Sequence, residues 1–269
     1  MLVRTIVGLI IAVVLLLCLY FGDWVFVTVF SLTFLFSVIE LNRAFKSKGL
    51  KVFIWPAYIL AATGGALYML TGYDALLLFA YALVLLTASV IGQVLITRDN
   101  FSSVLYCLIP FVYPLLSNIV ILILYFGLPR ATALTACGLA VLAPQAADVF
   151  AYLGGTLFGK HKLCPHISPK KTVEGGVCAL VGGVAGGVAM YFAQLFWGGP
   201  IGLVTLMVLG LVCGIVGQFG DLFASCIKRD AGIKDFSSIL PGHGGFLDRI
   251  DSTLLCAPII LAYFMILVA

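Results

Sequence analysis

Apolar stretches of about 20 residues follow one another along the whole chain, and this feature limits its possible folds more than any other. A helix needs about 20 predominantly apolar residues to cross the hydrocarbon core of a bilayer. The chain is 63% hydrophobic and only 10% charged, whereas soluble domains carry roughly 25% charged residues. Backbone polar groups in lipid must be satisfied within their own segment, so helices are expected. The sequence therefore predicts an all-α integral membrane protein, a polytopic bundle of about nine transmembrane helices.

The expected spans are separated by polar segments. They lie near residues 5–21, 24–41, 52–70, 75–96, 103–126, 131–157, 176–197, 201–224 and 250–268. In membrane proteins, lysine and arginine gather on the cytoplasmic side. If the N-terminus is cytoplasmic and the spans alternate, 14 of the 15 Lys and Arg residues fall inside and only Arg130 falls outside. This asymmetry predicts a cytoplasmic N-terminus and a C-terminus outside.

We expect the chain to divide near residue 130. Residues 1–130 would form a five-helix membrane scaffold, since their spans hold few charges. Residues 131–269 would form a four-helix catalytic region with two long cytoplasmic loops, at 158–175 and 225–249. Long loops in compact proteins are usually functional or disordered. Because these two are rich in Gly, Pro, Lys, Asp and His, we interpret them as functional.

Two aspartates, Asp148 and Asp221, lie within expected spans. An ionised carboxylate at the centre of a membrane helix costs roughly 2.5–3.5 kcal/mol on insertion scales, so it is a functional-site hypothesis by default. Their surroundings are alike, because a Gln precedes each Asp by three positions and a Phe-Ala pair follows it. We hypothesise that both helices line one cleft. The alternatives are a coincidental likeness and, for Asp148, a polar stripe that hydrogen-bonds neighbouring helices.

The segment 225–251 interleaves cations with carboxylates between the last two expected spans. Cationic side chains suit phosphate oxygens, and the expected phosphate ligands are Lys228, Arg229, Lys234 and Arg249. Carboxylates suit Mg²⁺, which binds through a few of them plus substrate phosphates, and the expected metal ligands are Asp221, Asp248 and Asp251. A glycine-rich run around His243 would let the backbone approach a ligand closely. These are the parts of a phosphoryl or nucleotidyl transfer site; the alternative is a solvated basic loop.

The loop 158–175 adds two adjacent lysines and a hydroxyl, at Lys170, Lys171 and Thr172. They suit a nucleoside triphosphate or a lipid phosphate, and the alternative is a basic patch against anionic lipid headgroups. The run Gly182-Gly183-x-x-Gly186-Gly187 follows no expected strand, so it is not a dinucleotide fingerprint. It predicts close packing of helices instead.

The segment 225–251 resembles the signature of the CDP-diacylglycerol synthase (phosphatidate cytidylyltransferase) family. That signature runs S-x-x-K-R, four residues, K-D, and then P-x-H-G-G-x-x-D-R-x-D. Its positions are filled here by Ser225, Lys228, Arg229, Lys234, Asp235, Pro241, His243, Gly244, Gly245, Asp248, Arg249 and Asp251. The resemblance covers about 145–251, whereas residues 1–130 match only in being hydrophobic.

The resemblance implies that CTP and phosphatidic acid react to CDP-diacylglycerol and pyrophosphate, with Mg²⁺ required and a second metal ion left open. It also implies a homodimeric, polytopic helical enzyme in the bacterial inner membrane or an equivalent bilayer, with its active site facing the cytoplasm. We expect no nucleic-acid partner. Carried over by position, the expected catalytic residues are Asp221, Asp248, Asp148, Lys228 and Arg229. The expected substrate-binding residues are Ser225, Lys234, Asp235, His243, Gly244, Gly245, Arg249, Lys170, Lys171 and Thr172.

Three other functions are weighed against this one. A CTP-dependent polyprenol or lipid kinase would share CTP, Mg²⁺ and the membrane but would release CDP instead of pyrophosphate. A cytidylyltransferase for another phospholipid, such as an ether-linked archaeal one, is closer. A transporter would carry polar residues near the midplane of several helices and usually repeated halves, and the first five expected spans lack such residues.

Overall fold

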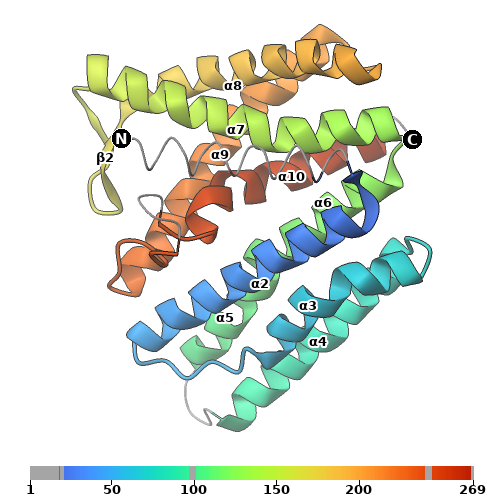
Figure 1. Cartoon of the computed structure of the whole chain (residues 1–269). Helices are drawn as coiled ribbons and strands as arrows, with labels where there is room; N and C mark the ends of the chain where they lie inside the picture. Colours follow the sequence, from blue (N-terminus) through green and yellow to red (C-terminus); the bar gives the residue numbers. More distant parts are fainter. Residues whose placement is uncertain (1–17, 19–20, 97–100, 240–243, 268–269) are drawn as a thin grey trace. The chain divides into compact units, whose positions relative to one another are not determined.

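The computed structural model describes residues 18, 21–96, 101–239 and 244–267, and most of these residues lie in helices (Figure 1). The elements in order are α2 Asp23–Ser47, α3 Trp55–Leu70, α4 Ala75–Ile96, α5 Phe101–Pro110, η1 Phe111–Leu115, α6 Leu116–Gly127, α7 Arg130–Phe158, β1 Lys162–Cys164, β2 Ser168–Thr172, α8 Val173–Gln194, η2 Leu195–Trp197, α9 Leu203–Asp230 and α10 Leu247–Leu267. Within the described residues, seven helical segments are long and apolar enough to cross a membrane. The chain is therefore a mostly helical, multi-pass type of membrane protein.

The number of spans stays a prediction. The expected span 5–21 lies outside the described residues. The expected span 52–70 corresponds to α3, which has 16 residues and is shorter than the roughly 20 residues that a crossing needs. The other seven expected spans correspond to the seven segments found. The span expected at 103–126 is continuous but contains the π-helical turn η1, in which Pro114 lies; proline lacks the N–H that the α-helical ladder requires.

The chain forms two compact units, which we describe separately. The first consists of Met1–Leu122 and Ile227–Arg249, and the second of Ile123–Cys226 and Ile250–Ala269. The first unit therefore combines the N-terminal helices with most of the expected loop 225–249.

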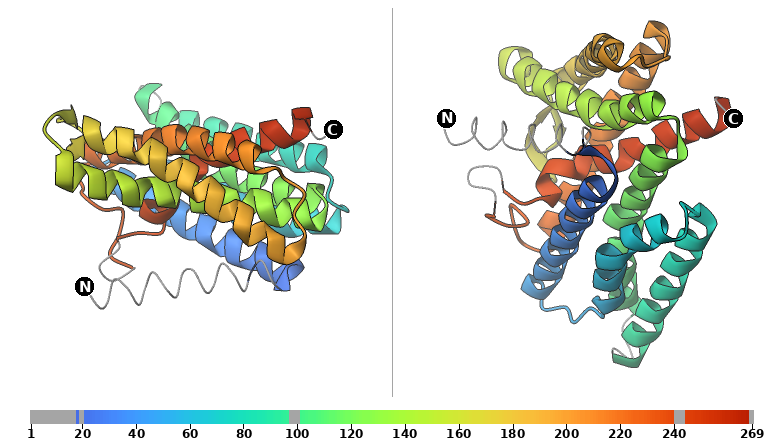
Figure 2. Two further views of the ribbon diagram at one scale, coloured as in Figure 1. Left: turned by 90° about the horizontal axis from the view of Figure 1, so that it is seen from above. Right: turned by 45° about the vertical axis from the view of Figure 1, so that its right-hand side comes forward.

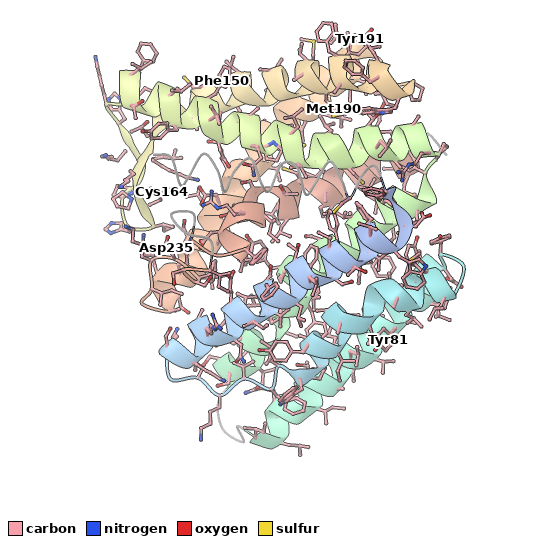
Figure 3. The ribbon with its side chains drawn as sticks, viewed as in Figure 1. Tyr81, Phe150, Cys164, Met190, Tyr191 and Asp235 are labelled. Atoms are coloured by element: carbon pink, nitrogen blue, oxygen red, sulfur yellow. The ribbon has the colours of Figure 1, made fainter. Side chains whose placement is uncertain are left out.

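In the first unit, α3 packs against both α2 and α4. Gly65 of α3 faces Val27 and Ser31 of α2, because a Cβ at this glycine would lie 2.7 Å and 3.0 Å from their side chains. On the α4 side, the Thr63 hydroxyl lies 2.8 Å from the hydroxyl of Tyr81, which Figure 3 labels on α4.

In the second unit, α7 and α8 lie side by side, as Figure 1 and both views of Figure 2 show. Met190 of α8 points toward α7 (Figure 3), where its Sδ would lie 2.9 Å from a Cβ at Gly138. The predicted close packing of the α8 glycine run is confirmed. Gly186 meets Ala143 of α7, and Gly183 meets Gly214 of α9, with 2.7 Å and 2.9 Å from a built Cβ to the neighbouring Cα. Small residues on two faces thus allow α8 to approach two helices at once.

The loop expected at 158–175 is not entirely a loop, since β1 and β2 form a two-stranded antiparallel ribbon within it (Figure 1). Lys162 pairs with Thr172, and Cys164 pairs with Ser168. Strands of three and five residues are too short for an alternating pattern to stand out in the sequence. The hydroxyl of Thr172 accepts a hydrogen bond of 3.1 Å from the N–H of Gly175, so Thr172 is the N-cap of α8.

The loop expected at 225–249 is also shorter than predicted. Helix α9 continues to Asp230, because the buried residues Ala224, Ile227 and Ala231 extend the helical spacing. The chain leaves the helix at Gly232, two residues after its end, whose φ of +69° suits a residue without a side chain. Helix α10 then begins at Leu247. Several of the expected functional residues therefore stand on helix ends rather than in a loop.

Candidate active site

Several of the expected site residues fall into two clusters, one in each unit. The loop cluster, in the first unit, comprises Lys228, Asp248, Glu40 and the loop residues Phe236, Ser237, Gly245, Phe246 and Leu247. The carboxylate cluster, in the second unit, comprises Asp148, Asp221, Asp251, Ser252 and Lys171.

Asp248 is the centre of the loop cluster. Its Oδ1 accepts a hydrogen bond of 2.6 Å from the Lys228 ammonium. Its Oδ2 accepts two backbone N–H groups, that of Phe236 at 3.0 Å and that of Gly245 at 2.9 Å. Lys228 and Asp248 are each 8% exposed, so neither charge has much water to replace its partner. Removing one member of such a buried pair is strongly destabilising; the pair therefore joins the end of α9 to the start of α10.

Glu40 of α2 completes the loop cluster and was not predicted as a site residue. Its Oε1 accepts the Ser237 hydroxyl at 2.5 Å and the Phe246 N–H at 2.9 Å. Its Oε2 accepts the Leu247 N–H at 2.9 Å. Glu40 is 0% exposed. Glu40 could have been identified in the same way as Asp148, because it is also a carboxylate within an apolar span.

The two glycines of the loop cluster are required by close approach and by backbone conformation. Gly244 has a φ of +84°, and a Cβ there would lie 2.9 Å from Asp248 Oδ2. A Cβ at Gly245 would lie 2.5 Å from both carboxylate oxygens of Glu40. We expected these glycines to let the backbone approach a ligand; within the described residues they let it approach two carboxylates. His243, with Pro241 and Gly242, lies outside the described residues.

The remaining cations of the signature lie at the surface of the first unit. Arg229, Lys234 and Arg249 are exposed, as is Asp235, which Figure 3 labels in the loop that follows α9. The Arg229 guanidinium donates a hydrogen bond of 3.2 Å to the carbonyl of Ile233. Their expected role in binding phosphate oxygens stays a prediction.

A second polar contact in the first unit joins the residue after α2 to the last residue of α9. The Lys48 ammonium pairs with the Asp230 carboxylate and bonds the Tyr106 hydroxyl. Tyr106 also donates a hydrogen bond of 2.6 Å to Asp230. The Asp230 carboxylate, followed by the Tyr106 hydroxyl, raises the pKa of Lys48 above its ordinary value. These residues were not predicted, because their positions in the sequence are far apart.

In the carboxylate cluster, one hydroxyl joins two acidic side chains. The Ser252 Oγ lies 3.0 Å from Asp148 Oδ2 and 3.3 Å from Asp251 Oδ1. The N–H of Ser252 also donates to Asp251 Oδ1, at 2.8 Å. Ser252 of α10 thus contacts both Asp148 of α7 and its neighbour Asp251, and the catalytic role expected for Asp148 stays a prediction.

Asp221 of α9 pairs with Lys171, whose ammonium lies 2.6 Å from Asp221 Oδ2. Lys171 stands at the end of the β ribbon, so the pair ties the ribbon to α9. Both side chains are about one quarter exposed, at 23% and 29%. The neighbouring Lys170 is exposed. Ser225, one turn beyond Asp221, is 8% exposed.

Asp148 and Asp221 share one side of the second unit. A Cβ at Gly217 of α9 would lie 3.1 Å from Pro144 of α7 and 3.4 Å from Ser252 of α10, so three helices meet there. Asp148 and Asp221 each follow this meeting point by four residues, which is one helical turn on the same face. Helices α7 and α9 run parallel, because each packs antiparallel to α8. The two aspartates therefore lie one turn beyond the same helix contact, and the cleft that they are expected to line stays a prediction.

The donor chemistry of both clusters fits a hard divalent cation. Mg²⁺ binds through one or two carboxylates and completes its octahedron with water and substrate phosphates. The bonds to Asp248 occupy three of its roughly four acceptor positions, so Oδ1 keeps capacity for a further ligand. Among the described residues, no group of three or more His, Cys, Asp or Glu side chains is placed to hold a metal ion. The ligand set Asp221, Asp248 and Asp251 therefore stays a prediction.

The ribbon carries one further polar contact, in the second unit. His161 Nδ1 lies 2.7 Å from Glu174 Oε1. The backbone N–H groups of Lys160 and His161 also donate to Glu174 Oε2, at 3.1 Å and 3.2 Å. Glu174 lies in the first turn of α8, where a carboxylate is favoured by the helix dipole. These bonds hold the start of the ribbon against the helix that follows it.

Comparison with known proteins identifies the family to which the chain is similar. The profile of the cytidylyltransferase family matches residues 2–267. A phosphatidate cytidylyltransferase of Staphylococcus haemolyticus is 36% identical over 183 residues, which are 68% of this chain and 66% of that protein. One of Synechocystis sp. is 44% identical over 138 residues, 51% of this chain and 45% of that protein. One of Aquifex aeolicus is 48% identical over 112 residues, 42% of this chain and 40% of that protein. The chain thus spans about two thirds of the length of the first relative and less than half of the other two.

Proposed function

The chain belongs to the cytidylyltransferase family, and from that premise we propose that it is a phosphatidate cytidylyltransferase, which makes CDP-diacylglycerol and pyrophosphate from CTP and phosphatidic acid. The observation that carries the proposal is the complete signature at 225–251, in a chain whose relatives bear this enzyme's name. A phosphate oxygen of the lipid forms a bond to the α-phosphorus of CTP. The bond from that phosphorus to the bridging oxygen of the β-phosphate breaks, and pyrophosphate leaves with the electron pair.

The chain's own residues position the reactants and balance their charge. Phosphoryl-transfer chemistry relies mostly on positioning and on neutralising the phosphates. We assign the phosphate oxygens of both substrates to the exposed cations and, in addition, to Lys171 and Lys228, each of which is paired with a carboxylate. No covalent nucleophile is needed, because the lipid phosphate itself attacks. Ser225 then acts as a support beside Asp221.

Mg²⁺ is the proposed cofactor, and Asp221, Asp248 and Asp251 are its proposed ligands, with Asp148 as a network carboxylate. When bound, the ion would neutralise the triphosphate charge. The bond from Ser252 keeps the Asp148 and Asp251 carboxylates close together. Lys171 pairs with Asp221 and Lys228 pairs with Asp248, each pair within its own unit.

We also propose a bacterial inner-membrane location with the N-terminus, the β ribbon and the loop 231–246 on the cytoplasmic side. The distribution of Lys and Arg, 14 of 15 on that side, supports this orientation. CTP is water-soluble, whereas a lipid phosphate lies at the bilayer surface, so a site for both belongs at that interface. A homodimer is proposed from the family resemblance.

The proposed reaction is tested by product analysis. Purified protein in detergent receives phosphatidic acid, CTP labelled at the α-phosphate, and Mg²⁺. We expect labelled CDP-diacylglycerol and unlabelled pyrophosphate, with activity lost when EDTA removes the cation. Asp221→Asn should lower kcat/KM at least about 100-fold, the scale on which single electrostatic contributions to a transition state are lost. Asp23→Asn is the matched control, because Asp23 is exposed and distant from the signature in sequence.

Two outcomes would contradict the proposal. Labelled CDP together with a newly phosphorylated lipid alcohol, when one is supplied, would identify a CTP-dependent lipid kinase. Absence of turnover with either acceptor, in protein that remains folded, would remove the support for both enzymes.

A further inference from the structure

We propose that Glu40 of α2 is a positioning residue for the loop between α9 and α10, because it holds the backbone amides of Phe246 and Leu247 at the start of α10 and so fixes the positions of Asp248 and Arg249. The inference rests on the proposed function for its catalytic consequence. It also assigns a role to a residue in the part of the chain expected to be only a scaffold.

The first argument is the hydrogen-bond accounting at the start of α10. The first N–H groups of a helix have no partner within the helix. Asp248 Oδ2 accepts the N–H of Gly245 at 2.9 Å, whereas Glu40 accepts those of Phe246 and Leu247, each at 2.9 Å. Three successive amides are thus bound by two carboxylates from helices far apart in the sequence. Without Glu40, two of these amides would lose their partner.

The second argument is burial and charge. The Glu40 side chain is 0% exposed, and the bonds that the structure gives it come from two amides and the Ser237 hydroxyl. A buried carboxylate is costly unless it is hydrogen-bonded, and the positive end of a helix favours it. The carboxylate charge is thus matched to the α10 N-terminus, and a neutral amide of the same shape would not replace it.

The third argument is that α2 holds the loop at both of its ends. At the end near α10, Phe36, one turn before Glu40, stacks on Phe246 with ring centroids 4.9 Å apart. At the end near α9, the Ser47 hydroxyl donates to the carbonyl of Ala231 at 3.1 Å. Residues on one face of a single helix therefore contact both ends of the loop. Glu40 is the charged part of this support.

The fourth argument is the link to the reacting residues. Asp248 follows Leu247 directly, and its Oδ2 also accepts the N–H of Phe236. A shift of the 246–247 backbone would therefore move the Asp248 carboxylate and its bond to Lys228 together. Displacements of about 1 Å at a catalytic group can lower a rate by about 100-fold.

The test compares Glu40→Gln and Glu40→Asp with a matched control, Gln93→Met. Gln93 is also 0% exposed, and it also fixes a loop in the first unit, through the Phe53 N–H at 2.6 Å and the Lys51 carbonyl at 3.0 Å. The Gln93→Met variant therefore measures the effect of releasing a different loop, at residues 51–53, from its buried side-chain partner. Hydrogen exchange of the peptide that begins at residue 244, thermal unfolding, and kcat and KM for CTP are measured for each variant in detergent.

We expect Glu40→Gln to accelerate exchange at 244–249 and to lower kcat about ten- to hundredfold, the range known for residues that orient catalytic groups. Gln93→Met should lower Tm by a similar amount but leave exchange at 244–249 and kcat near the wild-type values. Glu40→Asp should restore part of both readouts.

Unchanged exchange at 244–249 in Glu40→Gln would overturn the proposal, and so would a loss of kcat equal to that of Gln93→Met at equal Tm. If Glu40→Gln does not fold, Glu40→Asp is read by the same two criteria. If the wild-type protein shows no cytidylyltransferase activity, the proposed function fails by itself, and the exchange measurement still decides whether Glu40 holds the loop.

Discussion

At the scale of single residues, carboxylates decide the structure of the signature segment. Asp248 and Glu40 together accept five hydrogen bonds from backbone and hydroxyl groups, and Asp248 accepts the ammonium of Lys228 as well. A residue that resembles a metal ligand in the sequence therefore also organises the polypeptide around it. This double role means that substitutions at Asp248 report on folding as well as on catalysis.

The buried pair of Lys228 and Asp248 leads to a stability prediction. Lys228→Ala leaves the Asp248 carboxylate without its ammonium partner and should lower the free energy of unfolding by about 3–5 kcal/mol. The double variant Lys228→Ala with Asp248→Ala should lose less than the sum of the two single variants, because neither charge is then left alone. Denaturant unfolding in a fixed detergent measures all four proteins. If the loss in the double variant equals the sum of the losses in the two single variants, Lys228 and Asp248 do not stabilise the protein through their interaction.

At the scale of elements, small residues and caps decide how the helices of the second unit meet. Glycines on two faces of α8 allow α7 and α9 to approach its backbone, and Thr172 begins α8 directly at the end of β2. The ribbon therefore has no linker of its own before the helix. Its position follows from the first turn of α8, which also carries Glu174.

The N-cap of α8 leads to a prediction at this scale. Thr172→Ala removes the acceptor for the Gly175 N–H and should cost about 0.5–2 kcal/mol of stability. Thr172→Ser keeps the hydroxyl and should recover most of that loss. Thermal unfolding of the two variants in the same detergent is the measurement. Equal losses of stability in both variants would mean that packing of the Thr172 methyl group contributes more than the N-cap hydrogen bond. This methyl group lies beside Gly159, where a Cβ would be 2.8 Å from it.

At the scale of the whole molecule, the uneven distribution of charge governs insertion in the membrane. Seven described segments suit a bilayer crossing, and Lys and Arg gather in alternate connections. Short connections rich in Lys and Arg stay on the cytoplasmic side of the membrane. Orientation is therefore a property of the whole chain and can be tested without knowledge of the active site.

The proposed orientation leads to a labelling prediction. In a variant whose cysteines are replaced, His166→Cys in the β ribbon should react with an impermeant maleimide only from the cytoplasmic side. Asp74→Cys, between α3 and α4, should react only from the opposite side. Both positions are exposed, so reactivity reports the side of the membrane. Labelling of both from one side would overturn the alternation of spans.

Much of the fold was determined by the sequence alone, because hydrophobic length is a local property. The seven helical segments long and apolar enough to cross a membrane follow from runs of apolar residues, and the contact of the α8 glycines follows from their spacing. The signature residues were likewise recognised by their order in the chain. What was missed locally, the ribbon and the extension of α9 to Asp230, involves short segments or helix ends, where local signals are weakest.

Only the tertiary structure decided which side chains meet. Glu40 and Leu247 are separated by 207 positions, and Lys48 and Asp230 by 182, so no periodicity connects them. The same holds for the hydroxyl of Ser252 and the carboxylate of Asp148, which form a hydrogen bond across 104 positions. The physical reason is that helix formation depends on near neighbours, whereas a buried carboxylate takes its partners from whichever amides and cations the folded chain brings within hydrogen-bonding distance.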